Sequence, residues 1–202
     1  MTEPDRSFDL LILGAGPAGS SAAITARRAG LSVALIDKAR FPRDKLCGGL
    51  ITGRCAAHLW DIFGLDVDAD PLFERREVFE FYMDGQCLAR MEEVPPAWLT
   101  MRRAFDADLL HRALRAGAVV LTGERVQALD LDDNSLTLGS GERLEAERVW
   151  ICCGAELDGL FPEELGAQGL RRCKLQMMRT MPLGGERIGP MLAAGLTLGH
   201  YK

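Results

Sequence analysis

Two short apolar runs near the N-terminus have the length and composition of buried parallel strands. The first covers residues 10–13 and carries no charge, and the second covers residues 33–36 and ends at Asp37. The alanine-rich stretch between them, residues 17–29, has the spacing of a helix that packs closely on a sheet. The pattern therefore predicts a strand–helix–strand unit and an α/β fold class.

The remaining pattern predicts further strands and helices up to about residue 152. Helices are expected over residues 52–63, capped by Thr52, and over residues 107–116. The pair Asp84-Gly85 separates two β-like runs and predicts a hairpin turn. A β-meander is expected between residues 125 and 145, and a buried strand at 148–152. The predicted strands are 78–82, 87–91, 98–101, 118–121, 125–131, 136–138, 143–145 and 148–152.

A glycine motif, Gly14-x-Gly16-x-x-Gly19, lies where the first strand meets the first helix. In such motifs the first glycine permits a tight turn, the second admits a pyrophosphate and the third allows close helix–strand packing. The N–H groups at the helix start hold the phosphates, and an acid after the second strand accepts hydrogen bonds from ribose hydroxyls. The motif predicts a dinucleotide site whose cofactor-binding residues are Gly14, Ala15, Gly16, Pro17, Ala18, Gly19, Asp37 and Lys38.

Composition excludes several classes of function. A net charge of −5 leaves no basic surplus for neutralising nucleic-acid phosphates, so a nucleic-acid partner is not expected. No apolar run is long enough for a signal peptide or a transmembrane segment, which predicts a cytoplasmic protein. The six cysteines show no metal-binding spacing with the histidines, so reduced, mostly buried thiols are expected, with no metal and no disulfide.

Two further motifs carry a family resemblance. The loop after Asp37 contains FPRDKLCGG and ends in Cys47, Gly48 and Gly49, and the pattern RxxFDxxL begins at Arg102. Together with the glycine motif and Asp37, these segments resemble the geranylgeranyl reductase family, a branch of the p-hydroxybenzoate hydroxylase-like flavoproteins. The resemblance implies a Rossmann-type FAD/NAD(P)-binding fold that holds FAD through its ADP half.

The resemblance also implies roles for residues outside the glycine motif. Arg102 is expected near the pyrophosphate, the backbone near Val126 at the adenine, and Gly154 in a turn beside the cofactor. Cys47, Gly48 and Gly49 would approach the flavin or the substrate and form the catalytic segment. The implied reaction is hydride transfer from reduced flavin to a double bond of an apolar small-molecule substrate, with NAD(P)H or another electron donor.

The implied organisation is an FAD-binding domain over residues 1–155, with strands near 75–101 reaching into a substrate sheet. Residues 156–202 read as an incomplete C-terminal substrate or cap segment, and residues 161–201 resemble D-amino-acid-oxidase-type flavoproteins instead. The second FAD segment of both groups, with its Gly-Asp pair, does not follow Gly154. An FAD-dependent amine or amino-acid oxidase and a non-catalytic flavoprotein fragment therefore remain alternatives, and flavin retention separates the fragment from the enzymes.

Overall fold

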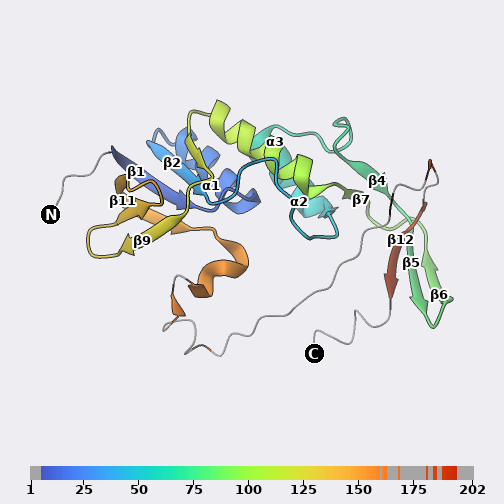
Figure 1. Cartoon of the computed structure of the whole chain (residues 1–202). Coiled ribbons are helices and arrows are strands. Elements are labelled where there is room, and N and C mark those ends of the chain that lie inside the picture. The colour runs from blue at the N-terminus through green and yellow to red at the C-terminus, as the bar shows by residue number, and fades with distance from the viewer. Residues whose placement is uncertain are drawn as a thin grey trace. The chain divides into compact units, whose positions relative to one another are not determined.

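The computed structural model describes residues 6–159, 161–162, 168, 181, 184–185 and 188–194. The described chain falls into two compact units (Figure 1). The first contains the described residues of 1–45 and 102–175, and the second contains those of 46–101 and 176–202. Most of residues 156–202, including the segment that resembles the oxidases, lies outside the described residues.

The first unit is built on a six-stranded sheet with the strand order β8-β2-β1-β11-β10-β9. The central strands β1 and β2 are the two apolar runs of the sequence, and they pair in parallel. Strands β8 and β11 extend this parallel arrangement on either side, while β10 and β9 continue it as an antiparallel ribbon. The strands are β1 Arg6–Leu13, β2 Val33–Asp37, β8 Val119–Thr122, β9 Val126–Asp130, β10 Ser135–Leu138 and β11 Arg143–Ile151.

The core of this unit lies along β1 and β2, which are covered on both faces. Leu11, Ile12 and Leu35 are each 0% exposed, as expected for central strands of a parallel sheet. Helix α1 (Pro17–Arg28) follows β1 directly, and it packs against helix α3 (Arg102–Arg115). This arrangement confirms the predicted α/β fold with a β-meander.

Three local expectations were wrong. Helix α3 begins at Arg102 rather than at residue 107, because Phe105 is buried and Arg102 pairs with Asp106 one turn later. The strands expected at 143–145 and 148–152 form the single strand β11, since it pairs with β10 at one end and with β1 along its length. Its last part is not buried, because Trp150 is 47% exposed.

The cysteines were also expected to be mostly buried, and this too was wrong for the described part of the chain. Cys47, Cys55 and Cys87 are exposed, and Cys152 and Cys153 are half-buried. Cys47 lies on a loop, Cys55 on a solvent-facing turn of α2 (Gly53–Phe63), Cys87 on the exposed strand β6 (Gln86–Met91), and Cys152 and Cys153 at the end of β11. At such positions the local sequence pattern gives little information about burial.

The described part of the second unit contains two small sheets and one helix. One sheet has the order β3-β7-β4 and the other β12-β5-β6, and each is three-stranded. Asp84 and Gly85 both have positive φ in the turn between β5 and β6, as the hairpin prediction requires. Thr52 caps helix α2 by accepting a hydrogen bond from the Cys55 backbone, also as predicted. The elements are β3 Leu50–Thr52, α2 Gly53–Phe63, β4 Glu74–Arg76, β5 Phe79–Met83, β6 Gln86–Met91, β7 Ala97–Leu99 and β12 Met191–Ala194.

None of the described helices is long and apolar enough to cross a membrane.

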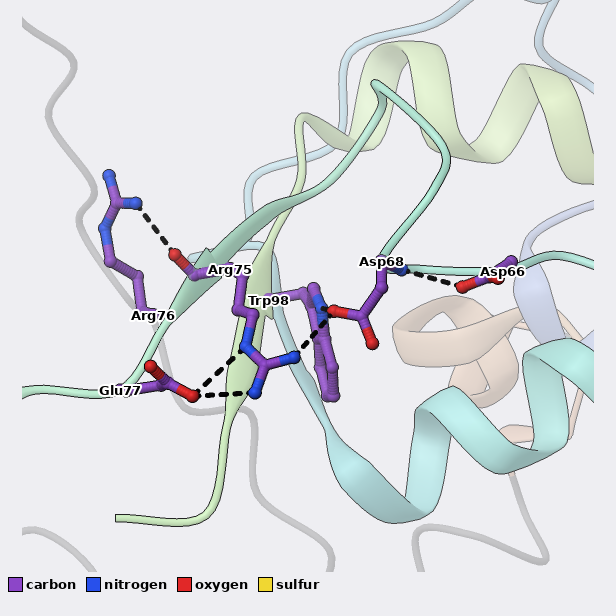
Figure 2. Close-up of polar contacts among 6 residues, drawn as sticks. All are labelled: Asp66, Asp68, Arg75, Arg76, Glu77 and Trp98. Atoms are coloured by element: carbon purple, nitrogen blue, oxygen red, sulfur yellow. Dashed lines mark hydrogen bonds and ion pairs between the residues drawn. The ribbon is translucent and has the colours of Figure 1, made fainter. Parts of the chain in front are cut away.

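Asp68 anchors a polar network on the β3-β7-β4 sheet (Figure 2). Its carboxylate accepts hydrogen bonds from Trp98 Nε1 at 2.9 Å and from Arg75 Nη1 at 3.1 Å. Arg75 and Trp98 are directly opposed in the pairing of β4 with β7, and the Trp98 side chain is buried. The hydrogen bond from Trp98, followed by that from Arg75, lowers the pKa of Asp68. The network therefore ties the loop before β4 to the sheet most strongly while Asp68 is ionised.

This network predicts an acid-sensitive second unit. Since the folded-state pKa of Asp68 lies below its unfolded value, its contribution is present above pH ~4 and is lost as the pH falls through the folded-state pKa. Asp68→Asn should flatten the decline of stability with acid, as measured by denaturant midpoints followed through tryptophan fluorescence. Asp84→Asn, in a turn position that favours asparagine, is the control and should keep the wild-type acid decline. Identical acid profiles for wild type and Asp68→Asn would contradict the assignment.

Candidate cofactor-binding site

The glycine motif forms the turn between β1 and α1. Gly14 has φ +102° and its backbone N–H donates to the Ile36 carbonyl at 2.7 Å. A Cβ atom on Gly14 would lie 2.4 Å from the Cys152 carbonyl oxygen, and one on Gly19 would lie 1.8 Å from the Gly14 carbonyl oxygen. Both positions therefore exclude a side chain because backbone occupies its place.

Gly16 differs from Gly14 and Gly19, because no backbone atom lies where its side chain would stand. It is the N-cap residue of α1 with φ −72°, and a Cβ there would meet only Arg43 Nη2, at 3.5 Å. The helix start has no side-chain capping hydrogen bond. The N–H groups of its first turn are thus directed at the space beside Gly16, the geometry that binds phosphate at helix N-termini.

Asp37 ends β2 and braces this turn. Its Oδ2 accepts a hydrogen bond from the Ala15 backbone at 2.8 Å, and its Oδ1 accepts one from the Ala39 backbone at 2.8 Å. The side chain is half-buried, and an ionised carboxylate has about four acceptor sites, so two backbone bonds leave capacity for ribose hydroxyls. Its carbonyl accepts from the Glu124 backbone at 3.1 Å, which brings the chain leading into Val126 beside Asp37.

Substitution of Asp37 by asparagine should weaken adenine-dinucleotide binding more than it weakens the fold. An amide cannot accept from both backbone N–H groups and a ribose hydroxyl, and it removes the charge that strengthens those bonds. We expect FAD affinity to fall by about 10- to 100-fold in fluorescence titrations. Asp44→Asn, on an exposed loop position, is the control, and equal losses for both variants would contradict a specific role for Asp37.

An ion cluster that the sequence did not predict joins residues of the FPRDKLCGG and RxxFDxxL motifs beside the same helix start. Asp106 on α3 is 0% exposed and accepts hydrogen bonds from Arg102 Nε at 2.6 Å and Nη2 at 3.0 Å. Arg43 Nη1 lies 3.1 Å from the Asp106 Oδ2 atom, and the Arg43 guanidinium stacks 4.8 Å from the centre of the Phe41 ring. The structure places Arg43, from the FPRDKLCGG loop, beside Gly16. Arg102, which was predicted near the pyrophosphate, shares the Asp106 carboxylate with Arg43.

The remaining predicted cofactor residues of the first unit occupy different surroundings. Lys38 forms an ion pair with Glu156 of the short 3-10 helix Gly154–Gly159. Gly154 has φ +62° and lies two residues after Cys152. The Cys152 backbone N–H donates to the Leu13 carbonyl at 2.7 Å. The end of β11 thereby returns to the Gly14 turn. Val126 opens β9 and is half-buried against the core.

The neighbouring thiols give no sign of activation. Burial raises the pKa of Cys152, and burial together with the nearby Asp37 charge raises the pKa of Cys153. Raised thiol pKa values disfavour the reactive thiolate. Among the described residues, no three or more His, Cys, Asp or Glu side chains gather as a metal site would require.

The proposed catalytic segment Cys47-Gly48-Gly49 belongs to the second unit. Gly49 is buried with φ +72°, and a Cβ on it would lie 2.0 Å from the Thr100 carbonyl oxygen. Its own carbonyl accepts from the Thr100 backbone at 2.9 Å, so Gly49 begins the pairing of β3 with β7. Gly48 has open space on its Cβ side, and Cys47 is exposed.

The first-unit residues fit the ADP half of a dinucleotide. The uncapped N-terminus of α1 and the Arg43 side chain beside it offer partners for phosphates. The Asp37 carboxylate, at the end of the next strand, offers acceptors for a ribose. The family model described as FAD dependent oxidoreductase matches residues 9–142. The chain belongs to this family. FAD is therefore its cofactor.

Some relatives of this flavoprotein have names that refer to quinones. It is 32% identical over 177 residues to a menaquinone reductase of Mycobacterium tuberculosis, an alignment covering 75% of this chain and 38% of the relative. It is 31% identical over 152 residues to a probable electron transfer flavoprotein-quinone oxidoreductase of Escherichia coli, covering 73% of this chain and 36% of the relative. The chain thus spans less than half the length of these relatives.

Solved structures show the same fold. The flavin-dependent brominase Bmp2 matches with a TM-score of 0.63 and 25% identity, covering 74% of this chain and 39% of that one. A flavoprotein/dehydrogenase from Cytophaga hutchinsonii matches with a TM-score of 0.66 and 24% identity, covering 77% and 42%. These likenesses agree with the Rossmann-type flavoprotein fold expected from the glycine motif.

Proposed function

We propose that this FAD-dependent oxidoreductase reduces a double bond in an apolar substrate that carries an isoprenoid chain, with a menaquinone as the favoured example. The observation that carries the proposal is the 32% identity to a menaquinone reductase over 75% of the chain. A menaquinone joins a quinone ring to an isoprenoid chain, so it also offers the kind of double bond that geranylgeranyl reductase-like enzymes would reduce.

In this proposal the first unit holds the ADP half of FAD. The free N–H groups of the α1 start and Arg43 bind the pyrophosphate, while Asp37 accepts from the ribose. Arg102, Lys38, Val126 and Gly154 are kept as proposed contacts from the sequence. Gly16 leaves room for the phosphates by having no side chain.

The flavin, when bound, supplies the hydride, and the protein's task is to orient it and to exclude water. The second unit is proposed as the substrate domain, and Cys47 with Gly48 as the segment that faces the reacting centre. Saturation of the double bond adds a hydride to one carbon and a proton to the other. The reduced flavin would supply the hydride and solvent the proton, so the proposal assigns no proton-transfer residue. The electron donor is proposed to be NAD(P)H or a reduced electron carrier.

The test is anaerobic incubation of the FAD-loaded chain with dithionite or NADPH and a menaquinone, followed by exposure to air and mass spectrometry. A saturated isoprenoid double bond survives air as a product heavier by one hydrogen molecule, whereas a quinol reverts to its quinone. The proposal expects the stable heavier product. An unchanged menaquinone mass would contradict the proposal, and hydrogen peroxide release with amino acids in an aerobic assay would favour the oxidase alternative instead.

A further inference from the structure

We infer that Asp106 is a positioning residue for phosphate binding, which aims the guanidinium of Arg43 at the start of helix α1. This inference rests on the proposed binding of the FAD pyrophosphate in the first unit and adds a residue that does not itself touch the cofactor. Asp106 lies on α3, fully buried, and reaches the site only through its arginine partners.

The two arginines contact Asp106 differently: Arg102 is bound to it by two donors, whereas Arg43 contacts it through one nitrogen. Arg102 gives two donors to Asp106, at 2.6 and 3.0 Å, as a bidentate pair within one turn of α3. Arg43 presents only Nη1 to the carboxylate, at 3.1 Å, and this buried nitrogen makes no aligned hydrogen bond. Its Nη2 lies toward Gly16, 3.5 Å from where a Cβ would stand.

The charge balance of the cluster also points to an anion. Two guanidinium groups share a single carboxylate, so the three side chains together carry one positive charge. They are largely enclosed, with Arg43 19% and Arg102 17% exposed, so solvent screens this charge only weakly. The uncapped N-terminus of α1 adds its own positive end at the same place.

Phe41 completes the support of Arg43. The ring stacks against the guanidinium at 4.8 Å, so the arginine is held from its face by Phe41 and from one edge by Asp106. A planar guanidinium fixed in this way keeps a second edge for a phosphate, the bidentate geometry for which arginine is suited. Preorganised donors of this kind lose little entropy on binding.

The test is a double-mutant cycle in the full chain with FAD and ADP as probes. Asp106→Asn and Arg43→Gln should each raise the Kd for FAD and for ADP by about 10-fold or more. The double variant should bind no more weakly than Arg43→Gln alone, because Asp106 acts through Arg43. Asp106→Glu should recover part of the lost affinity, and Arg103→Gln, an exposed neighbour on α3, should leave it unchanged.

Thermal unfolding and circular dichroism establish that each variant is folded. If Asp106→Asn fails to fold, the partly exposed Arg43→Gln decides alone, and unchanged affinity in that variant overturns the inference. Strictly additive losses in the double variant also overturn it, since Asp106 would then act through Arg102 or through the fold and not through Arg43. A wild-type chain that binds neither FAD nor ADP overturns the proposed site itself, whereas wild-type binding with unaltered variants overturns the roles of Arg43 and Asp106 and leaves the rest of the site standing.

Discussion

Replacing Gly19 with alanine is expected to lower the free energy of unfolding of the first unit by about 3 kcal/mol. The added methyl group would lie 1.8 Å from the Gly14 carbonyl oxygen and 3.2 Å from Leu35 Cδ1. Backbone must then move, and it is the backbone that shapes the phosphate turn, so flavin should be lost as well. Denaturant unfolding and flavin absorbance after desalting measure the two effects.

Gly16→Ala is the matched comparison within the same motif. Its Cβ would meet only Arg43, at an ordinary contact distance of 3.5 Å, and its φ is not strained. The fold should therefore keep its stability to within about 0.5 kcal/mol, while FAD affinity drops because the methyl group occupies the approach of the pyrophosphate. Equal stability of Gly19→Ala and Gly16→Ala would contradict this division of roles.

Replacing Gly49 with alanine is expected to cost the second unit about 2–4 kcal/mol of unfolding free energy. Gly49 has φ +72°, and a Cβ would lie 2.0 Å from the Thr100 carbonyl oxygen. The clash falls where the Gly49 carbonyl accepts from the Thr100 backbone, so the pairing of β3 with β7 should weaken. Hydrogen exchange of the Ile51 and Trp98 amides would follow this pairing directly.

Gly48→Ala provides the control one residue away. A Cβ at Gly48 meets nothing within 4 Å, so this variant should unfold like the wild type. Comparison of the two variants thus shows that the fold requires a glycine at position 49 but not at position 48. If Gly49→Ala kept full stability and lost only activity, the assignment of Gly49 to backbone packing would be wrong.

The turn that carries the glycine motif, and the strands on either side of it, follow from local sequence. Gly14, Gly19 and Asp37 sit at a strand end, a helix turn and the next strand end, and such positions are fixed within a few residues of chain. Asp37 was predicted only as a ribose acceptor, and the 2.8 Å hydrogen bond that it accepts from the Ala15 backbone was not predicted. Hydrophobic pattern alone fixed the buried strands β1 and β2.

The parts that depend on distant contacts were not predicted. Asp106 and Arg43 lie far apart in sequence, and only the packing of α3 beside α1 brings them together. The same packing starts α3 at Arg102, and pairing with both β1 and β10 joins two expected strands into β11. FPRDKLCGG was read as one functional loop, whereas its arginine belongs to the first unit and its Gly49 begins a strand pairing in the second.

A fluorescence titration of the 202-residue chain with FAD, repeated in the presence of ADP and of FMN, separates recognition of the adenine nucleotide from recognition of the flavin. We predict saturable binding of a single FAD that ADP displaces and FMN does not, because the first unit recognises the adenine-nucleotide half. Displacement by FMN without displacement by ADP, or no FAD binding in a folded chain, would contradict this prediction.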